Sequence, residues 1–179
     1  MWYLCGLGSN IDPEQNLVRA VTRLLESHDS LWLSPVIHTR PRGIDTERPF
    51  LNALAVVFSP LSPTQLKDHF NQLEEALGRD RSDPLSSRKD RPIDVDILEY
   101  SESGRFLGEG IDEPYYRRLF EGRTENSVRA SLTVAGHTLG QASATIHRDL
   151  RAGDEIVVQQ GQHLHDHTVK ASLTGQQGL

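Results

Sequence analysis

Cysteine is almost absent from this sequence, which contains only Cys5. A single cysteine cannot form an internal disulfide, so the chain does not depend on a disulfide framework and a reducing cytoplasm is the expected compartment. Cys5 lies in the apolar run of residues 2–7, and no His or Asn is placed by sequence to activate it. We therefore expect a buried small hydrophobe rather than a nucleophile.

Long hydrophobic runs and an excess of positive charge are also missing. No stretch of about 18 apolar residues could cross a bilayer, and the first residues lack the basic lead of a signal peptide. The 25 acidic and 19 basic residues leave a net charge of -6, which argues against a general nucleic-acid binder. We expect a cytoplasmic protein that acts on small molecules, with no membrane or nucleic-acid partner.

The length of 179 residues allows one main domain with a real core. Hydrophobic and charged contents of 36% and 25% are ordinary for a soluble globular protein. We expect one unit over residues 1–120, a β-rich extension over 121–170 that packs on it or continues it, and a flexible tail over 171–179. A monomer is the expected state, with a dimer as the alternative.

Hydrophobic periodicity in the first hundred residues predicts alternating strands and helices. Strands are expected at residues 2–7, 31–39, 50–58 and 93–98, with Pro35 marking an edge or bulge in the second. Helices are expected from Pro13 to about His28 and from Pro63 to Leu77, each preceded by a capping signal, Asp12 with Gln15 and Ser62 with Gln65. This order predicts an α+β, ferredoxin-like split βαβ sandwich, an antiparallel sheet with both helices on one face.

The pattern changes after Tyr100. A helical turn is expected over residues 113–120. Three later segments, SLTVAG, ASATIHR and DEIVVQQ, are expected to form short strands separated by glycine-containing turns. The fold class is therefore α+β with a β-rich C-terminal extension.

Two carboxylates alternate with apolar residues in the strand PIDVDILEY. Residues i and i+2 of a strand share a face, so Asp94 and Asp96 project side by side while Val95 packs the other way. Carboxylates this close repel each other unless a cation lies between them, and magnesium prefers such oxygen ligands. The alternative is a solvated strand face that happens to carry two acids.

The loop before this strand is rich in cations: Arg79, Arg81, Arg88, Lys89 and Arg91. Arginine forks match phosphate oxygens, and cations beside a metal site favour phosphoryl-type transfer. A surface loop whose cations only pair with nearby aspartates is the alternative. The acid pair and the cationic loop together indicate a nucleoside triphosphate held with magnesium.

Two further patterns suggest ligand contacts. Phe50 and Asn52 share one face of an otherwise apolar strand and would suit a flat heterocycle, unless the amide only bonds to neighbouring backbone. The GLGSN segment lacks the third glycine of a dinucleotide fingerprint, so we interpret it as a turn that brings Asn10 near a small ligand. Alternating His163, His165 and His167 could bind a metal if extended, but no matching ligand is apparent elsewhere.

Four ordered segments carry a family resemblance: GLGSN at residues 6–10, FLN at 50–52, LEEALGRDR at 73–81 and RPIDVDIL at 91–98. Together they resemble 6-hydroxymethyl-7,8-dihydropterin pyrophosphokinase of folate biosynthesis over about residues 1–100. That family has a ferredoxin-like fold and transfers pyrophosphate from ATP to the pterin hydroxymethyl group, using two magnesium ions.

The resemblance implies roles for individual residues. Asp94 and Asp96 would ligate both magnesium ions, Arg79 and Arg91 would contact the phosphates, and Arg81 would belong to a catalytic loop. The ATP site would further include Glu74, Arg88 and Ile97. The pterin site would be formed by Thr39, Arg40, Arg42, Gly43, Phe50, Asn52 and Asn10.

The chain also departs from the family pattern. Arg88 stands where a Trp is often found, and the later Pro-His segment, the downstream arginine and the Pro-Leu helix are missing. Residues 121–179 lie outside the resemblance. Two alternatives to an active pyrophosphokinase therefore remain: a catalytically weakened homologue that binds a pterin or nucleotide, and a ferredoxin-like interaction domain with an incidental acid pair.

Overall fold

The computed structural model describes residues 1–41, 46–80, 82–84, 90–149, 153, 155–165 and 173. Its strands in this part of the chain are β1 (Trp2–Ser9), β2 (Ser30–Leu33), β3 (Ile37–Thr39), β4 (Phe50–Phe58), β5 (Asp94–Ser101), β6 (Leu132–Val134), β7 (His137–Leu139), β8 (Ala144–Asp149) and β9 (Glu155–Gln160). Its helices are α1 (Pro13–His28), α2 (Pro63–Ala76) and α3 (Pro114–Glu121).

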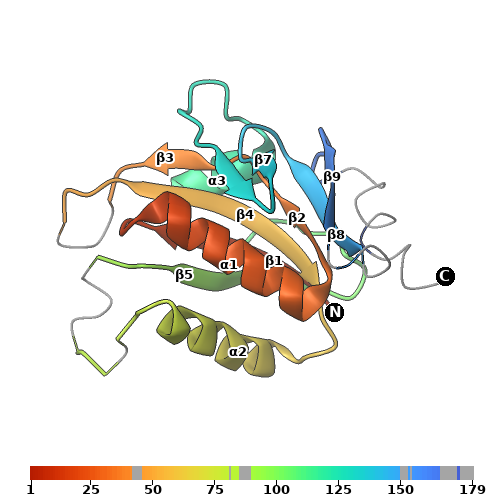
Figure 1. The fold of residues 1–179 in the computed structure, drawn as a ribbon, viewed down its shortest axis with the longest axis horizontal. Coiled ribbons are helices and arrows are strands. Elements are labelled where there is room, and N and C mark those ends of the chain that lie inside the picture. Colours follow the sequence, from red (N-terminus) through yellow and green to blue (C-terminus); the bar gives the residue numbers. More distant parts are fainter. Residues whose placement is uncertain are drawn as a thin grey trace.

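One antiparallel sheet organises the molecule, with strand order β5-β1-β4-β2-β8-β9 and β3 paired with β4 (Figure 1). The α+β class predicted from the sequence is confirmed at this level. β1 and β4 are buried along most of their length because they lie inside the sheet with helices on both faces, which explains their continuous apolar runs.

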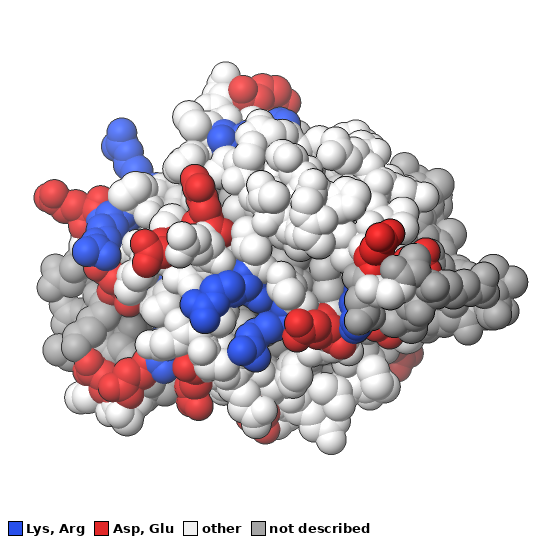
Figure 2. Space-filling view, in the orientation of Figure 1, with Lys and Arg blue, Asp and Glu red and all other residues white. Residues whose placement is uncertain are grey.

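The two faces of the sheet carry different helices (Figure 1). On one face α1 and α2 contribute residues such as Leu17, Val21 and Phe70 to the larger core cluster. On the other, α3 contributes Tyr116 and Phe120 to a second cluster that also holds both tryptophans. Figure 2 shows acidic and basic side chains interspersed over the described surface of the first face.

Helix α2 begins as its sequence predicts, because Ser62 and Gln65 form a reciprocal capping box. For α1 the predicted N-cap Asp12 and the proline in the first turn are confirmed, but the capping box with Gln15 does not form. Asp12 has left-handed backbone angles (φ 40°, ψ 54°) and its side chain makes no capping bond. Instead, the Asn16 side-chain amide, within the helix, donates to the Ile11 carbonyl at 2.6 Å and so connects the helix to the turn that precedes it.

Two strand predictions also need correction. The run predicted as one strand over residues 31–39 is two strands, β2 and β3, because Pro35 has no N–H for the ladder. On either side of it, the Ser34 N–H donates to Leu54 while the Val36 N–H donates to Gly140, so the chain changes partner at the proline. The turn expected at GLGSN begins later, since β1 continues through Ser9.

The C-terminal extension continues the main sheet. β8 pairs with β2 on the side away from β4, and β9 then pairs with β8. β6 and β7 form a separate hairpin. Among the described residues no helix is both long and apolar enough to cross a membrane. Cys5 is buried as predicted, and burial raises the pKa of its thiol well above the ordinary value.

Gly140 lies where the chain leaves β7, with φ +99°. A Cβ there would come within 2.2 Å of the Ala130 carbonyl oxygen, which is backbone and cannot rotate away. We expect Gly140→Ala to lower the free energy of unfolding by about 2–3 kcal/mol through strain and overpacking. The matched control is Gly136→Ala, where φ is +82° but nothing lies within 4 Å of the added carbon. Equal losses in urea unfolding of both variants would contradict the clash.

Candidate active site

The acid pair lies at the start of β5, on the sheet face that α3 covers. Asp94 and Asp96 pair with Gly8 and Gly6 of β1, while Val95 points to the opposite face and into the larger core. The two glycines matter because a Cβ on Gly6 would lie 2.6 Å from the Tyr116 ring. Bare backbone beside the acids therefore lets α3 approach the strand closely.

The Asp96 carboxylate of this pair is in an environment that disfavours its negative charge. Burial raises the pKa of Asp96 to about 7, and the charge of Asp94 beside it adds to this effect. A divalent cation would remove the repulsion and supply the missing solvation. Among the described residues no three His, Cys, Asp or Glu side chains are grouped to hold a metal. Two carboxylates offer hard oxygen ligands, which suit magnesium with water or phosphate oxygens in its other positions better than zinc.

Two arginines flank the pair and are held by carboxylates. Arg79 Nη1 donates to Glu74 Oε2 at 2.9 Å and to Asp94 Oδ1 at 2.8 Å, and Arg91 Nη1 donates to Asp94 Oδ2 at 2.9 Å. Glu74 is fully buried behind Arg79. Burial opposes the charge of Arg79, but Asp94 and Glu74 more than offset it, so its pKa is raised. The guanidiniums are thus oriented before any ligand arrives.

The acid pair also lies where two clefts adjoin. Both clefts are lined by Arg91, Asp94, Asp96, Asp112 and Glu113. The first, of about 380 Å³, is otherwise lined by Gly8, Thr39, Arg40, Phe50, Asn52, Tyr115 and Tyr116. The second, of about 480 Å³, is otherwise lined by Lys67, Phe70, Asn71, Arg79, Val95, Ile97, Leu98 and Gly110. Two ligands could therefore meet at the carboxylates.

The first cleft suits a flat, hydrogen-bonding ring. Asn52 Nδ2 donates to Thr39 Oγ1 at 2.5 Å, which fixes the amide, and Asn52 Oδ1 lies against Gly8 on the cleft floor. Tyr115 and Tyr116 form an edge-to-face pair with ring centroids 4.6 Å apart. Burial raises the pKa of Tyr115 to about 12, so its hydroxyl remains a neutral donor at physiological pH. Aromatic surface and fixed polar groups together can bind a heterocycle.

The second cleft is more cationic on one wall and apolar on another. Lys67 and Arg79 offer donors from α2 and the residues just after it, while Ile97 and Leu98 contribute apolar surface from β5. Such a mixture suits a ligand that has an anionic group and a less polar ring.

The structure brings together most of the predicted site residues that it describes. Thr39, Arg40, Phe50 and Asn52 line the first cleft, Arg79 and Ile97 line the second, and Arg91, Asp94 and Asp96 line both. Glu74 lies behind Arg79 rather than on the cleft surface. The predictions for Arg42, Gly43, Arg81, Arg88, Lys89 and His167 lie outside the described residues.

Asn10 has a different position from the one expected. Its side chain donates to Asp90 Oδ1 at 2.9 Å and accepts from the Arg91 N–H at 2.6 Å. It therefore anchors the chain just before β5 and, among the described residues, is not part of either cleft lining. His163 and His165 line another cavity, of about 410 Å³, beside the C-terminal end of α3.

Sequence reasoning missed several residues of the cleft walls: Lys67, Asn71, Asp112, Glu113, Tyr115 and Tyr116. Glu113 and Pro114 did predict the start of α3, and the tyrosines follow directly. The missing information was that α3 packs across β1 beside the acid pair. The glycines at positions 6 and 8 were a signal for this approach, because strand glycines often mark a close contact.

Known proteins resemble this chain over the region that contains the clefts. The family model of 7,8-dihydro-6-hydroxymethylpterin-pyrophosphokinase matches residues 4–142, so the expectation that residues 121–142 lie outside the resemblance is wrong. A 2-amino-4-hydroxy-6-hydroxymethyldihydropteridine pyrophosphokinase of Porphyromonas gingivalis is 35% identical over 111 residues, 61% of this chain and 76% of the relative. The enzyme of the same name from Bacillus subtilis is 31% identical over 120 residues, 64% of this chain and 70% of the relative.

Proposed function

Because this chain belongs to the 7,8-dihydro-6-hydroxymethylpterin-pyrophosphokinase family, we propose that it transfers pyrophosphate from ATP to the hydroxymethyl oxygen of 6-hydroxymethyl-7,8-dihydropterin, releasing AMP. This reaction is a step of folate biosynthesis. The observation that supports it most directly is the position of Asp94 and Asp96 at the junction of two clefts, one suited to a flat ring and one to an anionic ligand. A two-substrate transfer needs such an arrangement.

We further propose that Asp94 and Asp96 hold two magnesium ions together with ATP. The repulsion within the pair and the raised pKa of Asp96 support this ligand set. Magnesium bound there supplies positive charge that offsets the charge on the phosphate oxygens during transfer. Each flanking arginine has five N–H donors, so Arg79 and Arg91 can keep Asp94 and still contact phosphate.

The protein's own residues act mainly by positioning. Asn52 and Thr39, with Phe50 and the pair Tyr115 and Tyr116, hold the pterin in the first cleft. The nucleotide occupies the second cleft beside Ile97, with Glu74 orienting Arg79 from behind. The hydroxymethyl oxygen and the β-phosphorus then meet in line at the acid pair, where water is largely displaced by the two ligands. Arg81 and Arg88 would act from the loop before β5.

We also propose that residues 1–101 form a ferredoxin-like unit. The order β5-β1-β4-β2, with α1 and α2 on one face, supports this assignment. β8 and β9 would then be an addition to the free edge of β2.

The proposed reaction can be tested by mixing the protein with ATP, magnesium and the reduced pterin alcohol and measuring AMP. We expect AMP formation that requires the pterin alcohol. AMP at the level of a no-enzyme control, even at high protein concentration, would refute the reaction. Calorimetry would then distinguish the alternatives, because a weakened homologue still binds pterin or nucleotide and an interaction domain binds neither.

Gly8→Ala should affect the first cleft selectively. The added Cβ would lie 2.7 Å from Asn52 Oδ1 and would displace the amide from the cleft floor. We expect the KM for the pterin to rise by about tenfold, as for the loss of one buried hydrogen bond, and the KM for ATP to stay within about twofold. Steady-state kinetics with each substrate varied in turn measures both. A parallel rise of the two KM values would contradict the assignment of this cleft to the pterin.

A further inference from the structure

Both clefts share a wall formed by the segment between β5 and α3. Gly110 lines the second cleft, and Asp112 and Glu113 line both. Asp112 and Gly110 are exposed, and Glu113 does not use its side chain to cap α3 although it occupies the N-cap position. The position of this wall depends on the contacts that fix the backbone of residues 107–113, and these contacts come from side chains outside the clefts.

Glu99 of β5 holds the beginning of the segment. Its Oε2 accepts the Leu107 N–H at 2.8 Å and its Oε1 accepts the Gly108 N–H at 2.7 Å. A β-bulge in β5 determines the direction of this side chain. Cys5 of β1 pairs with Ile97 but Leu4 pairs with Glu99, so Leu98 is an extra residue without a partner position in β1. Without this bulge, Glu99 would share a face with Ile97. With it, Glu99 shares the face of Leu4, on the side of α3.

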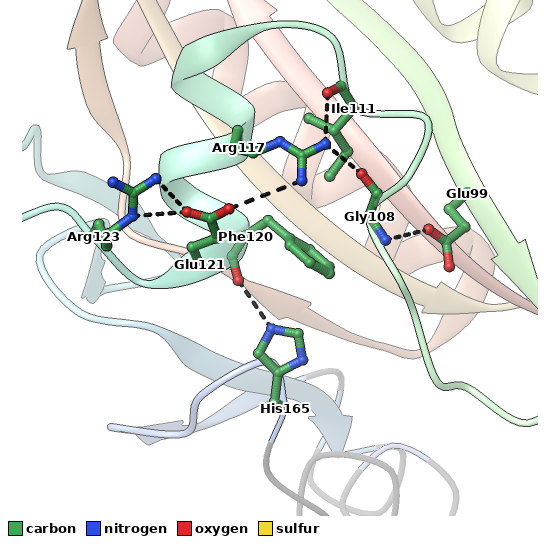
Figure 3. Close-up of polar contacts among 8 residues, drawn as sticks. All are labelled: Glu99, Gly108, Ile111, Arg117, Phe120, Glu121, Arg123 and His165. Carbon is green, nitrogen blue, oxygen red and sulfur yellow. Dashed lines mark hydrogen bonds and ion pairs between the residues drawn. The ribbon is translucent and has the colours of Figure 1, made fainter.

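Arg117 of α3 holds the same segment from the other side (Figure 3). Its Nη2 donates to the Gly108 carbonyl at 2.6 Å and to the Ile111 carbonyl at 2.9 Å, while Nη1 lies 3.9 Å from Glu121 Oε1. The Gly108 residue is thus bound at its N–H by Glu99 and at its carbonyl by Arg117. Its φ of +75°, with the Phe120 ring 2.6 Å from the position of a Cβ, leaves room only for glycine.

The end of α3 is in turn fastened to the C-terminal extension. His165 Nε2 donates to the Phe120 carbonyl at 3.0 Å, and the two rings pack edge to face (Figure 3). Together these contacts join β5, the cleft wall, α3 and the extension through hydrogen bonds to charged or aromatic side chains.

We propose that Glu99 and Arg117 are positioning residues that clamp residues 107–113 and so preform the nucleotide side of the active site. The inference rests on the proposed function for the identity of the ligand. Neither the Glu99 nor the Arg117 side chain lines either cleft, so both act through Gly110, Asp112 and Glu113. A preformed wall spares the nucleotide the free energy of ordering it.

Loss of the contacts made by Glu99 or Arg117 should weaken nucleotide binding more than it slows the transfer step. In Glu99→Ala and Arg117→Ala we expect the KM for ATP to rise about five- to tenfold, because the binding-competent wall is populated for less of the time. The turnover number should stay within about twofold, since the acid pair and its arginines are untouched. The KM for the pterin should change less, because Gly110, which lies between the clamped residues Gly108 and Ile111, lines only the second cleft.

The experiment compares these variants with two matched controls, Glu102→Ala and Arg118→Ala, whose parent residues are exposed neighbours of the clamp pair. Glu99→Gln and Arg117→Lys, which keep size and part of the bonding, should restore much of the ATP affinity and serve if an alanine variant does not fold. Calorimetry with magnesium and a non-hydrolysable ATP analogue should show the same five- to tenfold weakening. ATP affinity equal to that of the controls, or a fall in turnover as large as the rise in KM, would overturn the proposal. Absence of AMP from the wild-type protein would refute the reaction alone, because the calorimetry still tests the clamp.

Discussion

Replacing Asp96 by asparagine is expected to lower turnover by on the order of 10³-fold, because a neutral amide cannot hold the cations that offset phosphate charge in the transition state. The fold should not suffer. Burial and the neighbouring charge of Asp94 both disfavour the ionised form of Asp96, and these two effects raise its pKa to about 7. Removing that charge relieves both, so the melting temperature should stay the same or rise. Loss of activity with retained stability separates a ligand from a structural residue.

Asp94→Asn is the informative comparison, because it should lower both turnover and stability. Asp94 accepts from both Arg79 and Arg91, so its neutralisation should reduce turnover and also reduce stability. Asp68→Asn, on the exposed face of α2, controls for charge alone. AMP formation by the Asp96 variant at more than about a tenth of the wild-type rate would show that the metal is held elsewhere.

The second large effect is expected at Arg79. Its side chain is 9% exposed and joins Asp94 to Glu74, whose side chain is 1% exposed. Arg79→Met keeps much of the volume but removes a cation from two buried or half-buried carboxylates, and we expect a loss of about 3–5 kcal/mol of unfolding free energy. Glu74→Gln should cost less, because Arg79 retains its bond to Asp94.

A double-mutant cycle tests whether the two residues act as a pair. The variant that carries both Glu74→Gln and Arg79→Met should be more stable than the sum of the single losses predicts, by about 1–3 kcal/mol. Urea unfolding can be followed by the fluorescence of Trp2 and Trp32, which are both buried. Additive losses would mean that Glu74 and Arg79 contribute independently, and would remove the reason for assigning Glu74 an orienting role.

The elements of this fold were predictable where local signals agreed. β4 and α2 were expected at nearly their observed bounds because an apolar run ends at Ser59-Pro60 and a complete capping box follows. α1 also forms where the sequence predicts it, although its capping box is absent, since its apolar stripe alone determines the buried face. Pro35 predicts an edge or a bulge within one strand, but its missing N–H instead divides the run into β2 and β3.

The candidate site was predictable in part for the same reason. Asp94 and Asp96 follow from the period of two in a strand, and Phe50 with Asn52 follows from the same rule. The positions of Tyr115, Tyr116 and Glu113 could not be found this way, because they depend on α3 crossing β1, a contact between segments far apart in the chain. The role of Glu99 depends on a single bulge opposite Leu4 and Cys5, which only the pairing register reveals.

The sheet order also has a consequence for synthesis on the ribosome. β2 ends at Leu33, but β8, which covers its outer edge, begins only at Ala144. A growing chain that has already assembled β1, β4 and β5 therefore presents β2 as an open edge, which can pair with another nascent chain. β8 and β9 emerge later than β2, β4 and β5, close this edge and replace it with β9, whose exposed positions include charged and amide side chains at Glu155, Gln159 and Gln160. A chain truncated before β8 keeps every residue that lines the two clefts but leaves the edge of β2 open, so we expect it to aggregate during expression.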